Sequence, residues 1–319
     1  MMQTAIESIL KVVREGERFL VTAHENPDGD ALASTLALTL ALREAGKQVV
    51  AYNRDGVPGT FTFLPGSDSI VSELESGQQF DAVFVLDSGD LRRAGSDLHL
   101  RGKTLVNVDH HPGSDFGDVT FLDTAACATG ALVYRILKAG GIPISRDVAV
   151  CIYTAIMSDT GSFRYSNANP EAFLVAAEMV DCGVDAWSIA SHLYESQPLT
   201  RLRLLGEALK TLDVSLCGRF AAVTCTLDMF TTCQAGPEHT DGFINYPRSL
   251  EGVEVAIFFR QVRDDAVKVG FRSKGLVDVG SLASALGGGG HHNAAGVLVE
   301  GDIEAVRKDV FTRVQQLMP

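Results

Sequence analysis

Residues 17–46 read ERFLVTAHENPDGDALASTLALTLALREAG and carry a strand pattern followed by a helix pattern. The short apolar run in ERFLVTAH is typical of a buried β-strand, and DALASTLALTLALREAG has the length and the glycine stop of a helix. Between the two patterns lies a short segment rich in acidic and histidine residues. This stretch therefore predicts a strand, a polar loop and a helix in direct succession.

The same alternation continues outward through the first half of the chain. Further strand patterns are KQVVAYNRD, FDAVFVLDSGD and KTLVNVDHH, and helical patterns follow in TGALVYRILKAGG, SRDVAVCIYTAIMSDT, PEAFLVAAEMVDCG and AWSIASHLY. Strands that alternate with helices are typical of a parallel sheet covered on both faces. We predict an α/β fold with a mostly parallel sheet and helices on both sides.

The pattern changes after PLTRLRLLGEALKTL. Strand patterns without intervening helices follow in RFAAVTCTL, VEVAIFFRQV and AVKVGFRSK, and a late helix, DVGSLASAL, precedes a glycine run and a final helix. This change predicts two domains, which a chain of 319 residues is long enough to form. We place the first domain at residues 1–185, a helical connector at 186–214, and a smaller α/β domain at 215–319.

Composition narrows the class of protein. The chain is 46% hydrophobic and 21% charged, which is typical of a globular protein. Its net charge of −13 argues against binding of long nucleic acid. No apolar run reaches the roughly 18 residues of a membrane span, and the N-terminus lacks signal-peptide features, so we predict a cytoplasmic protein without membrane contact. We expect Trp187 in the core and the six cysteines to be buried free thiols.

Chemistry-bearing residues follow three of the predicted strands and one helix. His24, Asp28 and Asp30 lie at the end of ERFLVTAH and just after it, Asp87 lies near the end of FDAVFVLDSGD, and Asp109-His110-His111 ends KTLVNVDHH. Asp159 ends an apolar helical run. Taken singly, each has an ordinary alternative. The first loop fits an Asx turn with Asp30 as the N-cap, Asp87 an ordinary strand end, the histidine triplet an exposed turn, and Asp159 a helix terminus.

The joint pattern is more informative than any single motif. Carboxyl ends of parallel strands meet at one edge of a sheet, where ligands bind. Imidazole and carboxylate groups are suitable ligands for divalent cations. Six ligands suit two cations that share one carboxylate, and cations about 3.5–4 Å apart are a common arrangement for hydrolysis of phosphate esters. The sequence therefore predicts a two-metal phosphoesterase.

A second candidate site lies near the C-terminus. Gly287 to Gly290 precede His291-His292, and consecutive glycines allow backbone N–H groups to approach an anion closely. A flexible loop is the alternative for this run. Arg272, Ser273 and Lys274 end a strand and offer cationic and hydroxyl contacts to a phosphate, although simple solvation also explains Lys274. We predict substrate contacts from Arg272, Ser273, Lys274, Gly288, Gly289, Gly290 and His291.

The motifs together resemble the DHH phosphoesterase superfamily. The residues that carry the resemblance are HENPDGDAL, VLDSGD, VDHHPGS and SDTGSFRY, and GFRSK and GGGGHHNAAG resemble the DHH-associated substrate domain. Within the superfamily the chain is most similar to the bacterial nanoRNase and pAp phosphatase group. The matches extend over nearly the whole chain.

The resemblance implies specific roles for these residues. His24 and Asp28 would hold one Mn²⁺, with Mg²⁺ as the second choice of metal. Asp30, His110 and Asp159 would hold another Mn²⁺, and Asp87 would bridge the two. His111 would contact the scissile phosphate and assist catalysis, Asp109 would orient the histidine pair, and His291 would be the substrate-domain histidine. The resemblance also suggests a homodimer.

The activity implied by the resemblance is hydrolysis of short oligoribonucleotides to mononucleotides, of 3′-phosphoadenosine 5′-phosphate (pAp) to AMP, or of both. One alternative is a phosphodiesterase for cyclic or linear dinucleotides such as c-di-AMP and pApA. Inorganic pyrophosphatases share the DHH half, and a non-catalytic nucleotide-binding protein is the alternative outside enzymes. No aromatic series interleaved with basic residues marks a path for long single strands.

Overall fold

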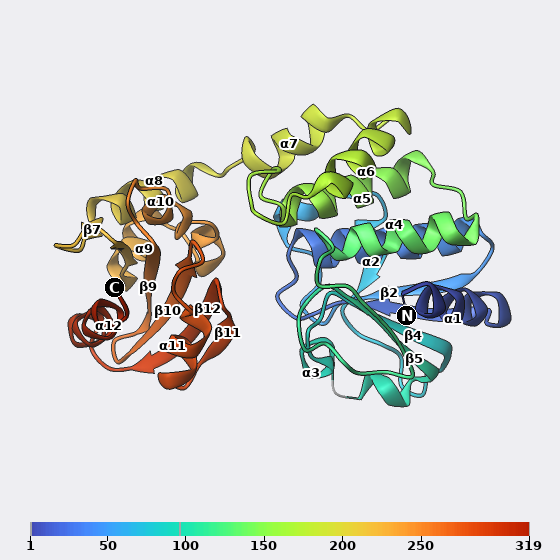
Figure 1. Cartoon of the computed structure of the whole chain (residues 1–319), viewed down its shortest axis with the longest axis horizontal. Helices are drawn as coiled ribbons and strands as arrows, with labels where there is room; N and C mark the ends of the chain where they lie inside the picture. Colours follow the sequence, from blue (N-terminus) through green and yellow to red (C-terminus); the bar gives the residue numbers. More distant parts are fainter. Residues whose placement is uncertain (1, 96, 319) are drawn as a thin grey trace. The chain divides into compact units, whose positions relative to one another are not determined.

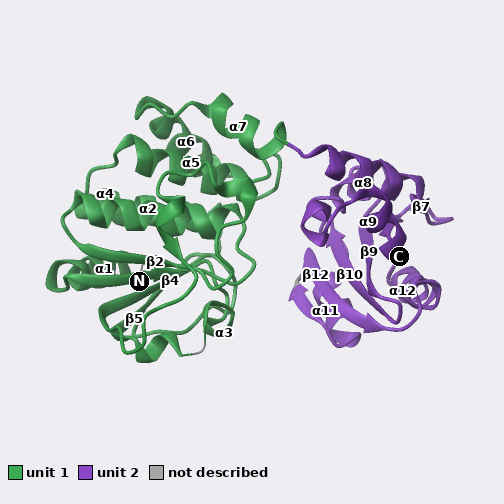
Figure 2. Cartoon of the chain, turned by 180° about the vertical axis from the view of Figure 1, so that it is seen from behind, with its two compact units in different colours: residues 1–196 green, residues 197–319 purple. Residues whose placement is uncertain are grey.

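The computed structural model describes residues 2–95 and 97–318, excluding the side chains of Met2 and His291. The chain forms two compact units, residues 1–196 and 197–319 (Figure 2). The predicted connector, residues 186–214, includes the last helix of the first unit and the first helix of the second. Each unit contains its own sheet.

Unit 1 is an α/β domain. Its strands are β1 (Arg18–Thr22), β2 (Gln48–Tyr52), β3 (Ile70–Val71), β4 (Phe80–Leu86), β5 (Gly102–Asp109) and β6 (Val119–Leu122). Its helices are α1 (Met2–Glu15), α2 (Gly29–Glu44), α3 (Leu91–Ala94), α4 (Thr129–Gly140), α5 (Arg146–Asp159), α6 (Pro170–Asp181) and α7 (Ala186–Tyr194). The predicted fold class is confirmed, because every strand pairing in this sheet is parallel.

The order of the strands explains where a site can form. The sheet runs β3-β2-β1-β4-β5-β6. From β1 the chain moves to one side of the sheet, and from β4 it moves to the other. The adjacent carboxyl ends of β1 and β4 are therefore a topological switch point, where open α/β sheets bind their ligands.

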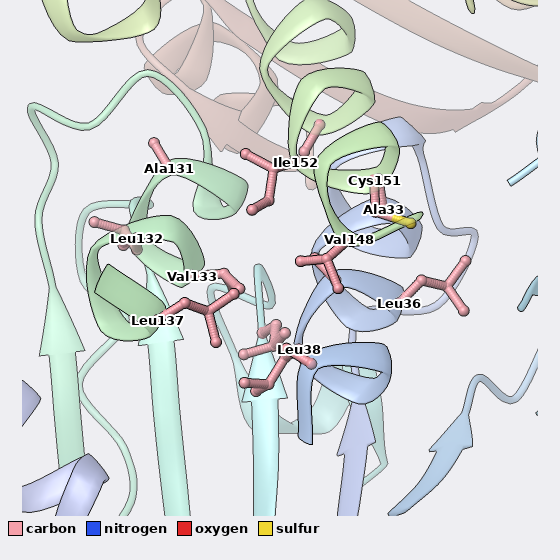
Figure 3. Packing of buried hydrophobic residues seen from close by; sticks show 14 of the residues in the cluster. Ala33, Leu36, Leu38, Ala131, Leu132, Val133, Leu137, Val148, Cys151 and Ile152 are labelled. Carbon is pink, nitrogen blue, oxygen red and sulfur yellow. The ribbon is translucent and has the colours of Figure 1, made fainter. Parts of the chain in front are cut away.

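Helices are distributed unequally over the two faces of this sheet. One face packs against a large core to which α1, α2, α4 and α5 contribute, whereas α3, the 3₁₀-helix η3 (Leu98–Leu100) and loops cover the other. Helix α2 is almost completely buried, because α4 and α5 pack against it (Figure 3). A helix that is apolar on all sides requires such an environment, which explains the Ala- and Leu-rich sequence of α2.

Unit 2 contains a mixed sheet of order β11-β12-β10-β9-β8-β7. Its strands are β7 (Asp213–Val214), β8 (Phe220–Cys225), β9 (Val255–Arg263), β10 (Ala266–Ser273), β11 (Gly289–His291) and β12 (Ala294–Glu300). Only β8 and β9 pair in parallel. The helices are α8 (Leu199–Lys210), α9 (Leu227–Cys233), α10 (Asn245–Arg248), α11 (Val279–Ala285) and α12 (Ile303–Leu317) (Figure 1).

Two expectations about burial are corrected by the structure. Trp187 is 64% exposed, because the inward stripe of the short helix α7 is formed by Ile189 and Leu193 instead. Of the six free cysteines, four are buried, whereas Cys182 is half-buried and Cys217 is exposed. In the part of the chain that the structure describes, no helix combines the length and apolar character that crossing a bilayer requires.

Candidate metal centre

The loop after β1 brings three of the predicted residues to the switch point. Asp28 is the N-cap of α2, and its Oδ1 accepts a hydrogen bond from the N–H of Ala31 (3.1 Å). The alternative that makes Asp30 the N-cap is therefore wrong. Asp30 lies inside the first turn and is buried. His24, also buried, lies between the end of β1 and this helix.

Asp87 directly follows β4 and has an unusual backbone conformation. Its φ of 52° is in the left-handed region, which disfavours most side chains and which aspartate tolerates better than most. Its N–H donates to the carbonyl of Val108 on the neighbouring strand (3.1 Å). Such strain persists only where the surrounding structure holds it, and it clusters at functional sites.

The triplet at the end of β5 separates into residues with different contacts. The buried carboxylate of Asp109 accepts hydrogen bonds from the Nδ1 of His111 (2.8 Å) and from the backbone N–H groups of Ser88 (3.1 Å) and Gly89 (2.6 Å). Asp109 thus orients His111. The Nδ1 of His110 lies instead 3.2 Å from the carbonyl oxygen of Ala126.

The six predicted metal ligands converge on one point. Asp87 Oδ2 lies 3.8 Å from His24 Nε2, which is 3.9 Å from Asp28 Oδ1. On the other side, His110 Nε2 lies 3.5 Å from Asp87 Oδ1 and 3.8 Å from both Asp30 Oδ2 and Asp159 Oδ2. The ligands form two sets, His24-Asp28-Asp87 and Asp30-His110-Asp159. Asp87 Oδ2 faces the first set, and Asp87 Oδ1 faces the second.

A third possible set, Asp87-His110-His111, is also compact. In this set, the Nδ1 of His111 lies 3.3 Å from Asp87 Oδ1 but only 2.8 Å from Asp109 Oδ1. A nitrogen that donates a proton to a carboxylate offers no lone pair to a cation. The hydrogen bond to Asp109 therefore excludes the Nδ1 of His111 as a ligand atom.

The distances and the ring orientations both fit a pair of cations. Separations of 3.5–3.9 Å are long for hydrogen bonds, whereas two ligands at about 2.0–2.2 Å from one ion lie at most roughly 4 Å apart. The Nδ1 atoms of His24 and His110 face the carbonyl oxygens of Glu25 and Ala126. A carbonyl only accepts, so these nitrogens carry the protons and Nε2 is left to bind metal.

The pKa shifts of the buried carboxylates also fit bound cations. Burial, together with the neighbouring carboxylates, raises the pKa of Asp159 to about 7, although His110 opposes the shift. The pKa of Asp30 is raised well above its ordinary value, first by burial and then by Asp87 and Asp159. Burial alone would raise the pKa of Asp87 as well, but its contacts with His111 and His110 lower it. Clustered buried carboxylates of this kind are stabilised as anions by bound cations.

Three residues that the sequence pattern did not reveal support these ligands. Asp30 accepts hydrogen bonds from the backbone N–H groups of Thr129 (2.6 Å) and Gly130 (3.0 Å), at the start of α4. The buried hydroxyl of Thr129 donates to Asp87 Oδ1 (3.0 Å). Asn167 donates to Asp159 Oδ2 (2.9 Å). These contacts join segments far apart in sequence, and no local motif indicates them.

In unit 2 the two predicted substrate motifs meet at one end of the sheet. Arg272 of β10 is in register with Ala294 of β12, which pairs with the backbone of His291 in β11. The side chain of His291 lies outside the described part of the structure. The exposed Lys274 follows β10, and its Nζ donates to the carbonyl of Leu250 (3.1 Å).

Ser273 faces inward rather than toward a ligand. Its hydroxyl is buried and donates to Glu254 Oε1 (3.0 Å), which also accepts from the N–H of Leu276 (2.7 Å). Glu254, which the sequence pattern did not indicate, therefore holds the loop after β10 in place.

Within the glycine run, Gly289 and Gly290 belong to the strand β11, whereas Gly287 and Gly288 precede it outside regular structure. A Cβ at Gly288 would lie 2.3 Å from the carbonyl oxygen of Gly296, and one at Gly290 would lie 2.4 Å from the Cα of Ala295. These glycines permit close packing of β11 on β12. Gly289, by contrast, has open space beside it.

Comparison with known proteins shows similarity along nearly the whole chain. The family model described as DHH family, N-terminal domain matches residues 18–156, and the DHHA1 domain model matches residues 231–317. The chain is 32% identical over 313 residues to a bifunctional oligoribonuclease and PAP phosphatase of Thermus thermophilus, covering 98% of this chain and 93% of that protein. A protein of the same description from Bacillus subtilis is 27% identical over 305 residues, covering 94% and 95%.

A solved structure matches the fold over nearly the whole chain. A crystal structure of an exopolyphosphatase-related protein from Bacteroides fragilis superposes with a TM-score of 0.92 at 28% identity, covering 98% of this chain and 95% of that one. Similarity thus extends over nearly the entire chain, in sequence and in structure. The chain belongs to the DHH family of phosphoesterases.

Proposed function

We propose that the chain hydrolyses short oligoribonucleotides to mononucleotides and pAp to AMP, at a centre that holds two divalent cations. The observation that carries the proposal is the pair of ligand sets that share Asp87. In this assignment His24 and Asp28 bind one cation and Asp30, His110 and Asp159 bind the other. Oxygen and imidazole ligands without thiolate favour Mn²⁺, with Mg²⁺ next.

When bound, such a pair of cations supplies an activated water and neutralises charge on the phosphoryl oxygens. The protein positions the ligands in advance. Thr129 fixes the side chain of Asp87, and the N–H groups at the start of α4 fix Asp30. Because these contacts use buried groups, the ligands need little rearrangement when cations bind.

His111 is assigned the contact with the reacting phosphate. Burial would lower the pKa of His111, but its hydrogen bonds with Asp109 and Asp87 raise it to about 11. These contacts favour the positively charged form of the imidazole. A charged imidazole held by Asp109 can donate a hydrogen bond to a phosphoryl oxygen or protonate the leaving oxygen.

The substrate class is supported by the relatives and by unit 2. The proteins from T. thermophilus and B. subtilis are described as acting on oligoribonucleotides and PAP. Arg272 lies at the same end of the unit 2 sheet as the glycine strand β11, where a phosphate can be held. A net charge of −13 fits a small phosphorylated substrate better than a long polymer.

The decisive assay uses the purified chain with Mn²⁺ and a panel of substrates. The panel contains pAp, short labelled oligoribonucleotides, pApA, c-di-AMP and pyrophosphate. We expect release of AMP from pAp and of mononucleotides from the oligoribonucleotides. His110→Ala and Asp87→Ala should abolish both activities, whereas Asp181→Asn, an exposed aspartate at the end of α6, should leave them intact.

Each contrary result identifies a different error. Preferred turnover of c-di-AMP or pyrophosphate would replace the proposed substrate class while retaining the site. Full Mn²⁺-dependent activity in His110→Ala would refute the site itself. Absence of turnover on the whole panel would favour a non-catalytic nucleotide-binding protein.

A further inference from the structure

The unit 2 sheet has one face that helices cover only in part. Val267, Val269 and Phe271 of β10 point into a core that also contains α11 and α12. On the opposite face, helices α8, α9 and α10 pack over β8 and β9. Beyond these helices, Lys268 and Leu298 are exposed where β10 and β12 pair. This part of the sheet, with β9, β10 and β12 adjacent to one another, is the open face (Figure 2).

Two cations lie directly opposite each other on the open face. Lys268 of β10 is in register with Arg260 of β9, and like charges at such positions destabilise an antiparallel pair. Neither side chain has a carboxylate partner within 4.0 Å in the described part of the chain. The guanidinium of Arg260 donates only to the carbonyl oxygen of Pro237 (3.3 Å). The two charges thus repel each other without a protein anion between them.

The pKa of Lys268 reflects this repulsion. Partial burial lowers the pKa of Lys268, and Arg260 lowers it further. Burial likewise lowers the pKa of Arg260, with weak opposing contributions from Cys225 and Glu238. An anion bound to both groups would offset this repulsion.

The pair is continuous with the predicted substrate residues. Arg272 lies on the same strand and the same face as Lys268, four residues and about 13 Å further along. Midway between them, Gly270 is in register with Gly296, and Gly296 with Gly289. At Gly270 an added Cβ would lie 3.7 Å from the Cδ1 of Ile244, in ordinary van der Waals contact. The open face therefore offers positive charge on both sides of Gly270.

We propose that Lys268 and Arg260 form a second phosphate subsite, which binds a backbone phosphate of an oligoribonucleotide beyond the one held at Arg272. The inference rests on the proposed function and extends it, because it assigns the contact that distinguishes longer from shorter substrates. Cations at two places on one face of the sheet, the Lys268–Arg260 pair and Arg272, suit a substrate with more than one phosphate. A single nucleotide or a dinucleotide has too few phosphates to use the second subsite fully.

Steady-state kinetics on substrates of two lengths test the subsite. KM is measured with Mn²⁺ for a diribonucleotide and a pentaribonucleotide, on the full chain and on Lys268→Gln. We expect Lys268→Gln to raise KM for the pentaribonucleotide by roughly three- to tenfold, as for loss of one charge-assisted contact, with a clearly smaller change for the diribonucleotide. The slope of log KM against log salt should fall by about 0.7 for the pentaribonucleotide.

Two matched variants complete the design. Lys268→Arg retains the charge and should restore the KM of the pentaribonucleotide. Lys308→Gln removes an exposed charge from α12, the helix that packs on the opposite face of the sheet, and should behave as the unmodified chain. An equal change at both lengths, or an unchanged KM and salt slope in Lys268→Gln, would overturn the subsite while the proposed function stands. If the unmodified chain cleaves neither oligonucleotide, the proposed function fails and the subsite with it.

Discussion

At the scale of single residues, Asp87 connects the two ligand sets. Its two carboxylate oxygens face different ligand sets, its backbone is in the left-handed region, and the Thr129 hydroxyl holds one of its oxygens. A bridging ligand must be placed accurately, because it contacts both ions at once. The strained backbone and the hydroxyl together fix that position.

Thr129→Val removes this hydroxyl and keeps the size of the side chain and the backbone N–H that binds Asp30. We expect the affinity for Mn²⁺ to fall by about 10- to 100-fold, as is typical when a group that orients a metal ligand is lost. Isothermal titration with Mn²⁺ measures the effect directly. Thr129→Ser should retain most of the affinity, and equal binding by the Val variant would show that the contact is not needed.

Asp109→Asn tests the separate role of His111. Asparagine can no longer stabilise a charged imidazole, so we expect kcat on pAp to fall by about 100-fold or more. Mn²⁺ affinity should change little, since Asp109 is not among the ligand sets. A parallel loss of Mn²⁺ binding would place Asp109 and His111 in the metal site instead.

At the scale of elements, the start of α4 has an unusual role. Its N-cap, Ala128, provides no side-chain hydrogen bond, and the free N–H groups of the first turn bind Asp30 instead. Helix N-termini stabilise negative charge. Asp30, a proposed metal ligand about one hundred residues earlier in the chain, therefore caps this helix, and the same hydrogen bonds fix the orientation of its carboxylate.

Gly130→Ala should disturb this arrangement. A Cβ at Gly130 would lie 2.4 Å from the Cβ of Ala155 on α5, so α4 must shift away from its neighbour. We expect a loss of about 1–3 kcal/mol in the free energy of unfolding, together with weaker Mn²⁺ binding. Urea denaturation and Mn²⁺ titration measure the two effects.

Gly206→Ala on α8 is the matched control. Nothing lies within 4 Å of the added methyl group at this exposed helical position. Alanine there should stabilise the chain by about 0.5–1 kcal/mol, through helix propensity alone. Similar stability changes in both variants would contradict the close contact between α4 and α5.

Much of the catalytic unit could be predicted because its signals are local. Short apolar runs that end in Asp or His mark β1, β4 and β5, and the parallel order of the sheet brings those ends to one edge. The convergence of His24, Asp87 and His110 follows from this topology. The contacts of Thr129 and Asn167 were not predictable, since they join distant segments without a periodic pattern.

Other features depend on tertiary context that outweighs local propensity. Glycine is depleted in β-strands, yet Gly289 and Gly290 lie in β11. Strand β12 pairs with them, and the close approach of the two strands at Gly290 leaves no room for a Cβ. Trp187 was expected in the core from its apolar surroundings, but the short helix α7 buries only one stripe. In both cases the local sequence does not indicate which element packs against the segment, and that packing decides the structure.

At the scale of the whole molecule, the candidate metal-ligand sets found among the described residues all lie in unit 1. Cations that bind the folded unit should stabilise it. At a free Mn²⁺ concentration about 1,000 times Kd, the stabilisation is about 4 kcal/mol, or roughly 8–16 °C in Tm for a unit of this size.

Thermal unfolding with Mn²⁺ and with EDTA measures this shift. The single tryptophan, Trp187, lies in α7 of unit 1, so its fluorescence follows the unit that binds metal. Asp87→Asn should abolish the difference between the two conditions. A shift of the same size in that variant would mean that Mn²⁺ stabilises the chain from another site.

Anomalous diffraction at the manganese edge, from crystals grown with Mn²⁺, locates the bound cations and their ligands. We predict two peaks about 3.5–4 Å apart, one beside His24 and Asp28 and the other beside Asp30, His110 and Asp159, with Asp87 in contact with both. A lone peak, a peak coordinated by His111, or density for manganese only outside these six side chains would contradict the two-metal centre.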